Sequence, residues 1–328
     1  MKNTIIFGNN SSFKQKETLV FFINENFDLK LENKIFSGSN LNKIKFFLKN
    51  FKSKKSKDKI ISFDISEQNK LLFVIVKEKL ITKSFAELGA NFYSFANANK
   101  INKINLYSDT LRSIKFYKKN TELVLNFIHG INLKSYSFVK YKTRDKNIYN
   151  FSLKIISSEK NLLSKKYFKY KAVELGVFHA RDLVSEPPNV LNPKKYVEIV
   201  KKLSSLGLKI QVYNESKMKK LGMHSLLGVG QGSINESFLV TIEWKGNKKS
   251  KEKPIAFVGK GVCFDTGGIS LKPAKFMEEM KYDMAGSAVV VGLLKTLALR
   301  KAKINAVGVV GLVENMPGGN AQRPGDIV

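Results

Sequence analysis

The sequence contains very little cysteine and histidine. Its single cysteine, Cys263, excludes an intramolecular disulfide framework, a CxxC redox pair and a zinc site built from several cysteines. The three histidines, His129, His179 and His224, occur without an HExxH pattern. We therefore expect no histidine-rich metal site within these residues. Cys263 itself is most simply interpreted as a small core residue.

Long hydrophobic runs are also missing. Only three apolar residues, at positions 5–7, follow the polar start of the chain, which is too few for the hydrophobic part of a signal peptide. The longest apolar stretch, residues 288–299, is interrupted by Lys295 and is too short to cross a bilayer. We therefore expect a cytoplasmic protein with no membrane partner.

The charge is strongly positive but evenly spread. The formal net charge is +30, of which residues 1–150 carry +16 and residues 151–328 carry +14. Of the 57 basic residues 52 are lysine and five are arginine, whereas base readout relies on arginine. We interpret the charge as solvated surface and expect no specific nucleic-acid partner. A non-enzymatic nucleic-acid-binding or scaffolding role remains the alternative to an enzyme.

The length of 328 residues suggests about two domains. In the first part, strand-like runs at 4–7, 19–23, 71–76 and 101–107 alternate with a helical pattern at 82–98. In the second part, strands are expected at 208–213, 238–244, 255–264 and 304–313, and helices at 166–184, 193–206 and 285–300. The predicted class is α/β, with an N-terminal domain at 1–150, a linker at 151–170 and a second domain with a mixed sheet at 171–328.

Two glycine-rich segments differ in what they predict. The run Gly228-Val-Gly230-Gln-Gly232 lacks the GxGxxG spacing, and we interpret it as a tight backbone turn. In contrast, Gly267 and Gly268 follow Asp265 at the end of a predicted buried strand. Glycines at such a position let the backbone bend closely around whatever the carboxylate binds.

Charged residues gather around that strand end. Lys260 precedes Asp265 by five residues, and Asp283 stands at the start of the next predicted helix. Two carboxylates at the C-terminal edge of a sheet are typical of cation sites. The nearby lysines, Lys260 and Lys272, could pair with the carboxylates, or one could be a neutral amine that donates to a metal.

Simpler interpretations of the same residues remain open. Asp283 precedes a helical pattern and could cap that helix. Asp265 could stabilise the glycine turn that follows it. Lys260 could form an ion pair with either carboxylate. Spacing alone does not decide between these roles and a metal site, because charged loop residues are common in proteins without metals.

The second half of the chain resembles the cytosol (leucyl) aminopeptidase family, the two-metal exopeptidases that form hexamers. Four segments match in order over residues 180–328, and the metal-binding segment matches almost position by position. They are Ala180-Arg-Asp-Leu-Val-Ser-Glu-Pro-Pro-Asn189-Val-Leu, Leu226-Leu-Gly-Val-Gly-Gln-Gly-Ser233, residues 258–288 and Val313-Glu-Asn-Met-Pro-Gly-Gly-Asn-Ala-Gln-Arg-Pro-Gly-Asp-Ile-Val328. Residues 1–165 are similar to the family only in size and α/β character.

The resemblance implies roles for five residues. Lys260, Asp265 and Asp283 would be ligands of two divalent ions, Mn²⁺, Zn²⁺ or Mg²⁺, with Asp265 bridging them. Lys272 would be the catalytic electrophile, and Met280 would line the pocket for the substrate's N-terminal side chain. The implied activity is metal-dependent release of leucine-like N-terminal amino acids from peptides with a free N-terminus, by a homohexamer when the chain is of full length.

The sequence departs from the family in one respect. The family carries an Asn-Thr-Asp-Ala-Glu-Gly-Arg motif soon after the last matching segment, and its Asp and Glu complete the metal site. That motif does not occur in these 328 residues. We therefore expect a catalytic domain represented by its N-terminal part only, an inactive fragment, and apolar surface left uncovered beside the strand at 304–313. A metal-binding remnant without turnover is a further possibility.

Overall fold

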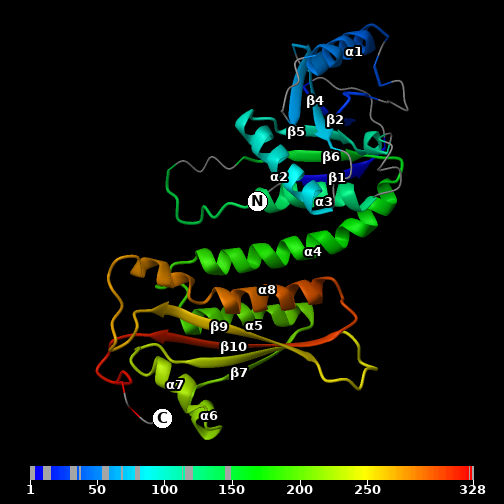
Figure 1. Cartoon of the computed structure of the whole chain (residues 1–328). Helices are drawn as coiled ribbons and strands as arrows, with labels where there is room; N and C mark the ends of the chain where they lie inside the picture. The colour runs from blue at the N-terminus through cyan, green and yellow to red at the C-terminus, as the bar shows by residue number, and fades with distance from the viewer. Residues whose placement is uncertain are drawn as a thin grey trace. The chain divides into compact units, whose positions relative to one another are not determined.

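The computed structural model separates into two compact units, Met1–Tyr170 and Lys171–Val328 (Figure 1). It describes residues 4–9, 16–29, 35–36, 38–53, 59–67, 69–77, 82–112, 114, 121–144, 149–324 and 326. Both units contain a β-sheet with helices packed against it. The α/β class with two domains, expected from the sequence, is therefore confirmed.

The first unit is built on a six-stranded sheet in the order β1-β6-β5-β2-β4-β3. All neighbouring strands are parallel except β3, which is antiparallel to β4. The strands are β1 (Thr4–Gly8), β2 (Thr18–Asn24), β3 (Ile60–Ser66), β4 (Asn69–Val76), β5 (Lys103–Tyr107) and β6 (Ser152–Ile156). The helices are α1 (Gly38–Ser53), α2 (Thr82–Ala98), the 3-10 helix η1 (Ser108–Leu111) and α3 (Thr121–Lys134).

The central strands of this sheet are buried on both faces. Val20 and Phe22 of β2 belong to a hydrophobic cluster that includes α2 and α3. Phe21, between them on β2, belongs to a second cluster, which includes α1. Because successive side chains of a strand point to opposite faces, the two clusters lie on opposite sides of the sheet. This explains why these strands have continuous apolar runs in the sequence.

Helices α2 and α3 approach each other closely through two glycines. A Cβ atom at Gly130 would lie 1.8 Å from the Ala86 carbonyl oxygen, and one at Gly89 would lie 2.0 Å from that of Phe127. Non-bonded atoms cannot approach so closely. Any residue larger than glycine at either position would therefore push the helices apart. The glycines here provide space rather than an unusual backbone angle.

The segment predicted as a linker, residues 151–170, has regular structure. It contains β6, which pairs with β1 and β5, and the first part of helix α4 (Lys160–Ser185). The compact first unit extends to Tyr170. Most of the polar residues that suggested a linker, within 145–165, precede α4, whereas Leu163 and Tyr167 on that helix are buried in the core of the first unit.

The second unit contains a four-stranded sheet in the order β7-β8-β10-β9. Strand β8 is antiparallel to β7 and β10, and β9 is parallel to β10, which makes the sheet mixed as predicted. The strands are β7 (Lys209–Tyr213), β8 (Phe238–Lys245), β9 (Ile255–Asp265) and β10 (Asn305–Asn315). The other elements are α5 (Pro193–Lys201), η2 (Lys202–Leu206), α6 (Glu215–Lys220), α7 (His224–Gly230), η3 (Met277–Tyr282) and α8 (Ala285–Leu299).

Helix α8 connects the parallel strands β9 and β10 and packs directly on β9. A Cβ atom at Gly259 would lie 2.7 Å from the Gly286 carbonyl oxygen, so the strand and the helix touch through backbone atoms. Cys263, on the same strand, is 1% exposed and belongs to the core, as expected. Because β9 and β10 are parallel, their C-terminal ends meet at one edge of the sheet, where the charged residues are found.

Strand β9 is one of the two edges of this sheet, and β7 is the other. We predicted exposed apolar surface beside the strand at 304–313, but β10 lies inside the sheet between β8 and β9. Within the described residues β9 pairs with β10 alone, and its Val258 and Ile255 are 80% and 54% exposed. The exposed apolar surface is therefore one strand farther out than predicted. Such an edge offers unpaired backbone groups to another chain.

The segment 228–232 is only in part the tight turn that we predicted, since a turn closed by the Ser233 amide and the Gly230 carbonyl oxygen at 3.0 Å covers residues 231–232 alone. Gly228 and Gly230 lie in helix α7, and both are buried. A Cβ atom at Gly230 would lie 2.1 Å from Ser237 Oγ, and one at Gly232 would lie 2.2 Å from the Met316 carbonyl oxygen. The glycines are thus required by close packing of α7 and the residues after it, and not by a backbone conformation of positive φ.

One segment in the described part of the chain, Met277–Leu299, is long and apolar enough to cross a membrane by length and composition. It combines η3 with α8, and 56% of its most apolar stretch is buried inside the structure. Helix α8 contributes Ala288, Val291 and Leu294 to the hydrophobic core of the second unit. Its apolar composition therefore agrees with a core helix packed on a sheet.

Candidate active site

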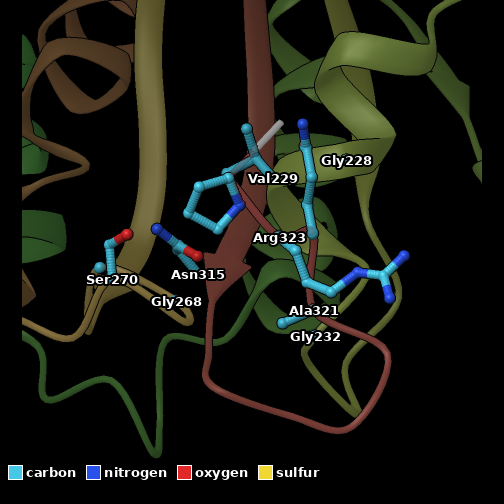
Figure 2. A pocket seen from close by; sticks show the side chains of 11 residues that line it. Gly228, Val229, Gly232, Gly268, Ser270, Asn315, Ala321 and Arg323 are labelled. Carbon is cyan, nitrogen blue, oxygen red and sulfur yellow. The ribbon is translucent and has the colours of Figure 1, made fainter. Parts of the chain in front are cut away.

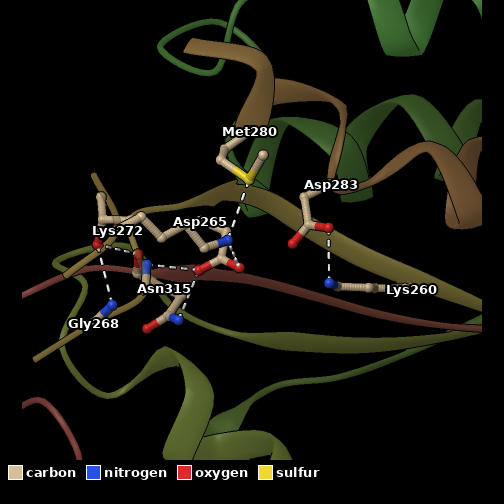
Figure 3. Close-up of polar contacts among 9 residues, drawn as sticks. Lys260, Asp265, Gly268, Lys272, Met280, Asp283 and Asn315 are labelled. Atoms are coloured by element: carbon tan, nitrogen blue, oxygen red, sulfur yellow. Dashed lines mark hydrogen bonds and ion pairs between the residues drawn. The ribbon is translucent and has the colours of Figure 1, made fainter. Parts of the chain in front are cut away.

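Asp265 ends strand β9 and is held by three hydrogen bonds (Figure 3). Its Oδ1 accepts from the Gly267 amide at 2.9 Å and from Asn315 Nδ2 at 2.8 Å, and its Oδ2 accepts from Lys272 Nζ at 2.6 Å. Burial alone would raise the pKa of Asp265, but these hydrogen bonds outweigh it and lower the pKa below its ordinary value. The side chain is therefore an ionised carboxylate at neutral pH.

The loop after β9 folds back so that Lys272 reaches this carboxylate. Gly267 and Gly268 have φ angles of +91° and +73°, which favour glycine, and the Lys272 amide donates to the Thr266 carbonyl oxygen at 2.9 Å. Lys272 Nζ also lies 3.2 Å from the sulfur of Met280, in η3. Two residues that the sequence suggested for catalysis and substrate binding are thus in direct contact.

Lys260, in the middle of β9, and Asp283 form a second pair. Lys260 Nζ lies 2.7 Å from Asp283 Oδ1. The lysine side chain is 62% exposed, and that of Asp283 is 20% exposed. Asp283 Oδ2 is buried and has no hydrogen-bond partner among the described residues. A buried carboxylate oxygen without a donor is costly, and it is the kind of atom that a cation would satisfy.

The structure supports two of the simpler interpretations of these residues and contradicts the third. Asp265 does stabilise the glycine turn, and Lys260 does pair with Asp283. In contrast, the helix-cap interpretation of Asp283 is wrong. Helix α8 begins after Met284, and its cap makes no side-chain hydrogen bond. Asp283 instead ends the short helix η3, which turns its side chain toward β9 (Figure 3).

A cavity of about 280 Å³ adjoins Asp265 (Figure 2). Asn315, Gly268 and Ser270 line one side, and Val229 and Arg323 line another. The cavity shares Asn315 with the Asp265 cluster, because the same side chain donates to that carboxylate. Three residues of the last motif, at positions 325, 327 and 328, lie outside the described residues.

The donor atoms from β9 to the start of α8 fit a divalent cation in part. Two carboxylates occur in this segment, one of them with an unpartnered oxygen, and each is paired with a lysine ammonium that a cation could replace. A neutral lysine amine and carboxylate oxygens are suitable donors for Zn²⁺ or Mn²⁺. However, no cluster of three or more His, Cys, Asp and Glu side chains suited to a metal occurs in the described part of the chain.

Sequence reasoning missed two residues of the cluster, Asn315 and Thr266. The Asn315 carbonyl oxygen accepts from the Thr266 amide at 2.9 Å and from its hydroxyl at 2.8 Å. Asn315 lies opposite Asp265 in the register of β9 and β10. A polar residue at the end of the parallel neighbour of a site-bearing strand is the signal that could have identified it.

Comparison with known proteins gives the same assignment for the second half of the chain. Residues 178–328 match the model described as the cytosol aminopeptidase family, catalytic domain. A protein of Phytoplasma australiense named "Probable cytosol aminopeptidase" is 47% identical over 253 residues, which is 77% of this chain and 50% of that protein. A protein of the same name from Chelativorans sp. (strain BNC1) is 57% identical over 203 residues, 61% of this chain and 41% of that protein.

Solved structures agree at the level of the fold. A variant of tomato leucine aminopeptidase superposes with a TM-score of 0.77 at 22% identity, and the match covers 100% of this chain and 66% of that chain. The bottromycin maturation enzyme BotP in complex with Mn gives 0.71 at 22% identity, over 95% and 63%. The chain spans about half the length of the curated relatives it matches. The C-terminal unit is therefore similar to the catalytic domain of the cytosol aminopeptidase family over residues 178–328.

Proposed function

We propose that the C-terminal unit provides part of the active site of a metal-dependent aminopeptidase that releases leucine-like N-terminal residues from peptides. The observation that carries this proposal is the pair of lysine–carboxylate contacts made by residues of β9. They lie within the segment that matches the catalytic domain of the family. The relatives named as cytosol aminopeptidases support a peptide substrate and a location in the cytoplasm.

In this proposal Lys260, Asp265 and Asp283 hold divalent ions, Mn²⁺, Zn²⁺ or Mg²⁺. A bound ion supplies a Lewis acid and lowers the pKa of water. Asp265 is suited to bridge two ions because its carboxylate is ionised and fixed by hydrogen bonds. Asp283 contributes the buried Oδ2 that has no other partner in the described structure.

In this proposal Lys272 acts on the substrate and does not hold the metal ions. Its ammonium is held at the edge of the cluster by Asp265 and is 34% exposed, so that it can donate to a carbonyl oxygen as negative charge develops there. Met280 lies against Lys272 and lines the space for the N-terminal side chain of the peptide. A thioether adapts to side chains of different shape, which suits a pocket for leucine-like residues.

The full-length enzyme is proposed to be a homohexamer, as the family resemblance implies, and residues 1–328 alone are proposed to be inactive. The test is hydrolysis of leucine p-nitroanilide with Mn²⁺ or Zn²⁺ supplied. Residues 1–328 are compared with an extended version, which adds the remaining C-terminal part of the Phytoplasma australiense relative. We expect metal-dependent turnover by the extended version only, because the described residues contain no complete metal cluster.

Two outcomes would contradict the proposal. Absence of metal-dependent turnover by a folded extended version would refute the aminopeptidase function. Equal turnover by both versions would refute the incomplete site, and would require ligands elsewhere in these residues or from a partner subunit. A version extended by the same residues with the Asp and Glu of the Asn-Thr-Asp-Ala-Glu-Gly-Arg motif changed to alanine is the matched control, and we expect it to be inactive.

A further inference from the structure

The proposed mechanism gives no role to Asn315, although this residue makes three hydrogen bonds with Asp265 and Thr266. Asn315 ends strand β10 and lies opposite Asp265 in the parallel register with β9. The register shifts between Val313 and Asn315, so the strand is irregular at this point. Irregularities of this kind often re-aim a side chain beside a functional site.

Asn315 contacts two successive residues, Asp265 through its side chain and Thr266 through its backbone carbonyl group. Its side-chain Nδ2 donates to Asp265 Oδ1 at 2.8 Å. Its backbone carbonyl oxygen accepts from the Thr266 amide at 2.9 Å and from the Thr266 hydroxyl at 2.8 Å. The loop returns close to the same side chain, because a Cβ atom at Gly268 would lie 2.8 Å from Asn315 Oδ1.

The two oxygens of the Asp265 carboxylate have different hydrogen-bond partners. Oδ1 accepts two hydrogen bonds, one from the Gly267 amide and one from Asn315, whereas the hydrogen bond to Oδ2 comes from Lys272. Rotation of the carboxylate would break both hydrogen bonds to Oδ1. An amide donor fixes that orientation without adding charge, whereas an aspartate at position 315 would repel Asp265.

We propose that Asn315 is a positioning residue, which locks Asp265 Oδ1 so that Oδ2 is presented to a divalent cation. The inference rests on the proposed function, because it takes Asp265 as a ligand. The β10 backbone contacts with Thr266 do not need the side chain, so its loss should affect the orientation of Asp265 more than the fold. Partners that orient a metal ligand commonly contribute 10- to 100-fold to metal affinity.

The test measures Co²⁺ binding to the extended version, because the described residues alone contain no complete metal cluster. Asn315→Leu removes the amide donor and keeps a similar volume. Asn305→Leu is the matched control, because Asn305 begins the same strand and its Nδ2 bonds to the Asn247 carbonyl oxygen, far along β10 from Asp265. Co²⁺ affinity and its visible absorption spectrum report on ligand geometry, and amide hydrogen exchange at Thr266 and Gly267 reports on the loop without metal.

We expect Asn315→Leu to weaken Co²⁺ binding about 10- to 100-fold, to alter the absorption spectrum and to speed exchange in the loop. Asn305→Leu should change none of these. Unaltered Co²⁺ affinity and spectrum in Asn315→Leu would overturn the proposal, even if exchange were faster, because the side chain would then be purely structural. Absence of Co²⁺ binding by the unaltered extended version would refute the metal role of Asp265 itself, and with it the positioning role, which distinguishes that failure from the first.

Discussion

The two sheets of the molecule differ in how completely they are buried. The six-stranded sheet of the first unit has a hydrophobic cluster on each face. The four-stranded sheet of the second unit has one large cluster, and its edge strand β9 exposes Val258 and the side chain of Lys260. The lysine–carboxylate pairs lie at this open strand, where charged groups keep part of their hydration. Incomplete burial in the second unit therefore accommodates charged side chains that full burial would disfavour.

The first prediction tests whether the charged pairs serve reaction rather than stability. Lys272→Ala in the extended version should lower turnover by about 10²–10³, the typical loss for one oxyanion donor. Because the pair with Asp265 is partly exposed, the free energy of unfolding should change by no more than about 1 kcal/mol. Turnover measured at saturating metal, beside a thermal unfolding curve, checks both values.

Lys275→Ala is the matched control, since Lys275 lies on the same loop with its ammonium 5.2 Å from the Phe276 ring centroid. We expect it to keep full turnover. Loss of bound metal in Lys272→Ala, or turnover close to that of the unaltered version, would contradict the assigned role.

Lys260→Ala in the extended version, in contrast, should strongly reduce metal affinity.

A second prediction concerns the first unit, where packing alone is expected to matter. Gly130→Leu should destabilise this unit by about 1–3 kcal/mol or more, because its Cβ has no room beside the Ala86 carbonyl oxygen. Gly38→Leu is the control, since no atom lies within 4 Å of a Cβ there. Unfolding followed by hydrogen exchange in each unit separates the effects. Equal stability of the two variants would show that the helices can separate without cost.

The third prediction concerns the open edge of β9. Val258→Lys should reduce self-association of the 328-residue chain and change the free energy of unfolding by no more than about 0.5 kcal/mol, because this side chain is 80% exposed. Sedimentation at several concentrations measures the association. Leu221→Lys replaces another exposed apolar residue away from the strand and should leave association unchanged. Equal self-association of Val258→Lys and the unaltered chain would exclude β9 as the edge strand through which the chain associates.

The smallest expected effect is a difference between nucleic-acid sequences. The positive charge is shared almost equally by residues 1–150 and 151–328, at +16 and +14, so we expect no selectivity for one duplex over another. Binding to any duplex should weaken steeply with salt, because it depends on counterion release. Fluorescence anisotropy with two unrelated duplexes tests this. Sequence-selective binding at about 150 mM salt would favour the nucleic-acid-binding alternative.

The elements of both sheets were largely predictable because their apolar periodicity is strong. The runs that became β2 and β4 are buried on both faces, and the helical spacing of Phe85, Leu88 and Phe92 placed one side of α2 in the core. The regular structure at 151–170 was not predicted, because the five-residue strand β6 lies between polar segments that together suggest a boundary. Two glycines of the segment 228–232 were misinterpreted since sequence does not distinguish a glycine needed for space from one needed for its φ angle.

The candidate site was predictable where one segment contains it. Asp265, Lys272, Met280 and Asp283 follow one another within a single stretch, and the structure brings them together in pairs, although their proposed roles remain predictions. Asn315 was not predictable, because it comes from a strand about fifty positions away. Its contact with Asp265 depends on the parallel register of β9 and β10, which no local pattern encodes.

The contact between Gly259 and Gly286 has a consequence for reading related sequences. These glycines set how near α8 comes to β9, and hence the separation of Lys260, next to Gly259, and Asp283, three residues before Gly286. A methyl group at position 259 would lie 2.7 Å from the Gly286 carbonyl oxygen and lengthen that separation, whereas one at position 286 would lie 3.2 Å from the Lys260 amide nitrogen and require a smaller shift. In a homologue, alanine at both positions would therefore indicate a protein whose sequence keeps the aspartate and the lysine but whose structure lacks the ion pair between them. Two residues without side chains can thus serve as a diagnostic of whether this pair is retained.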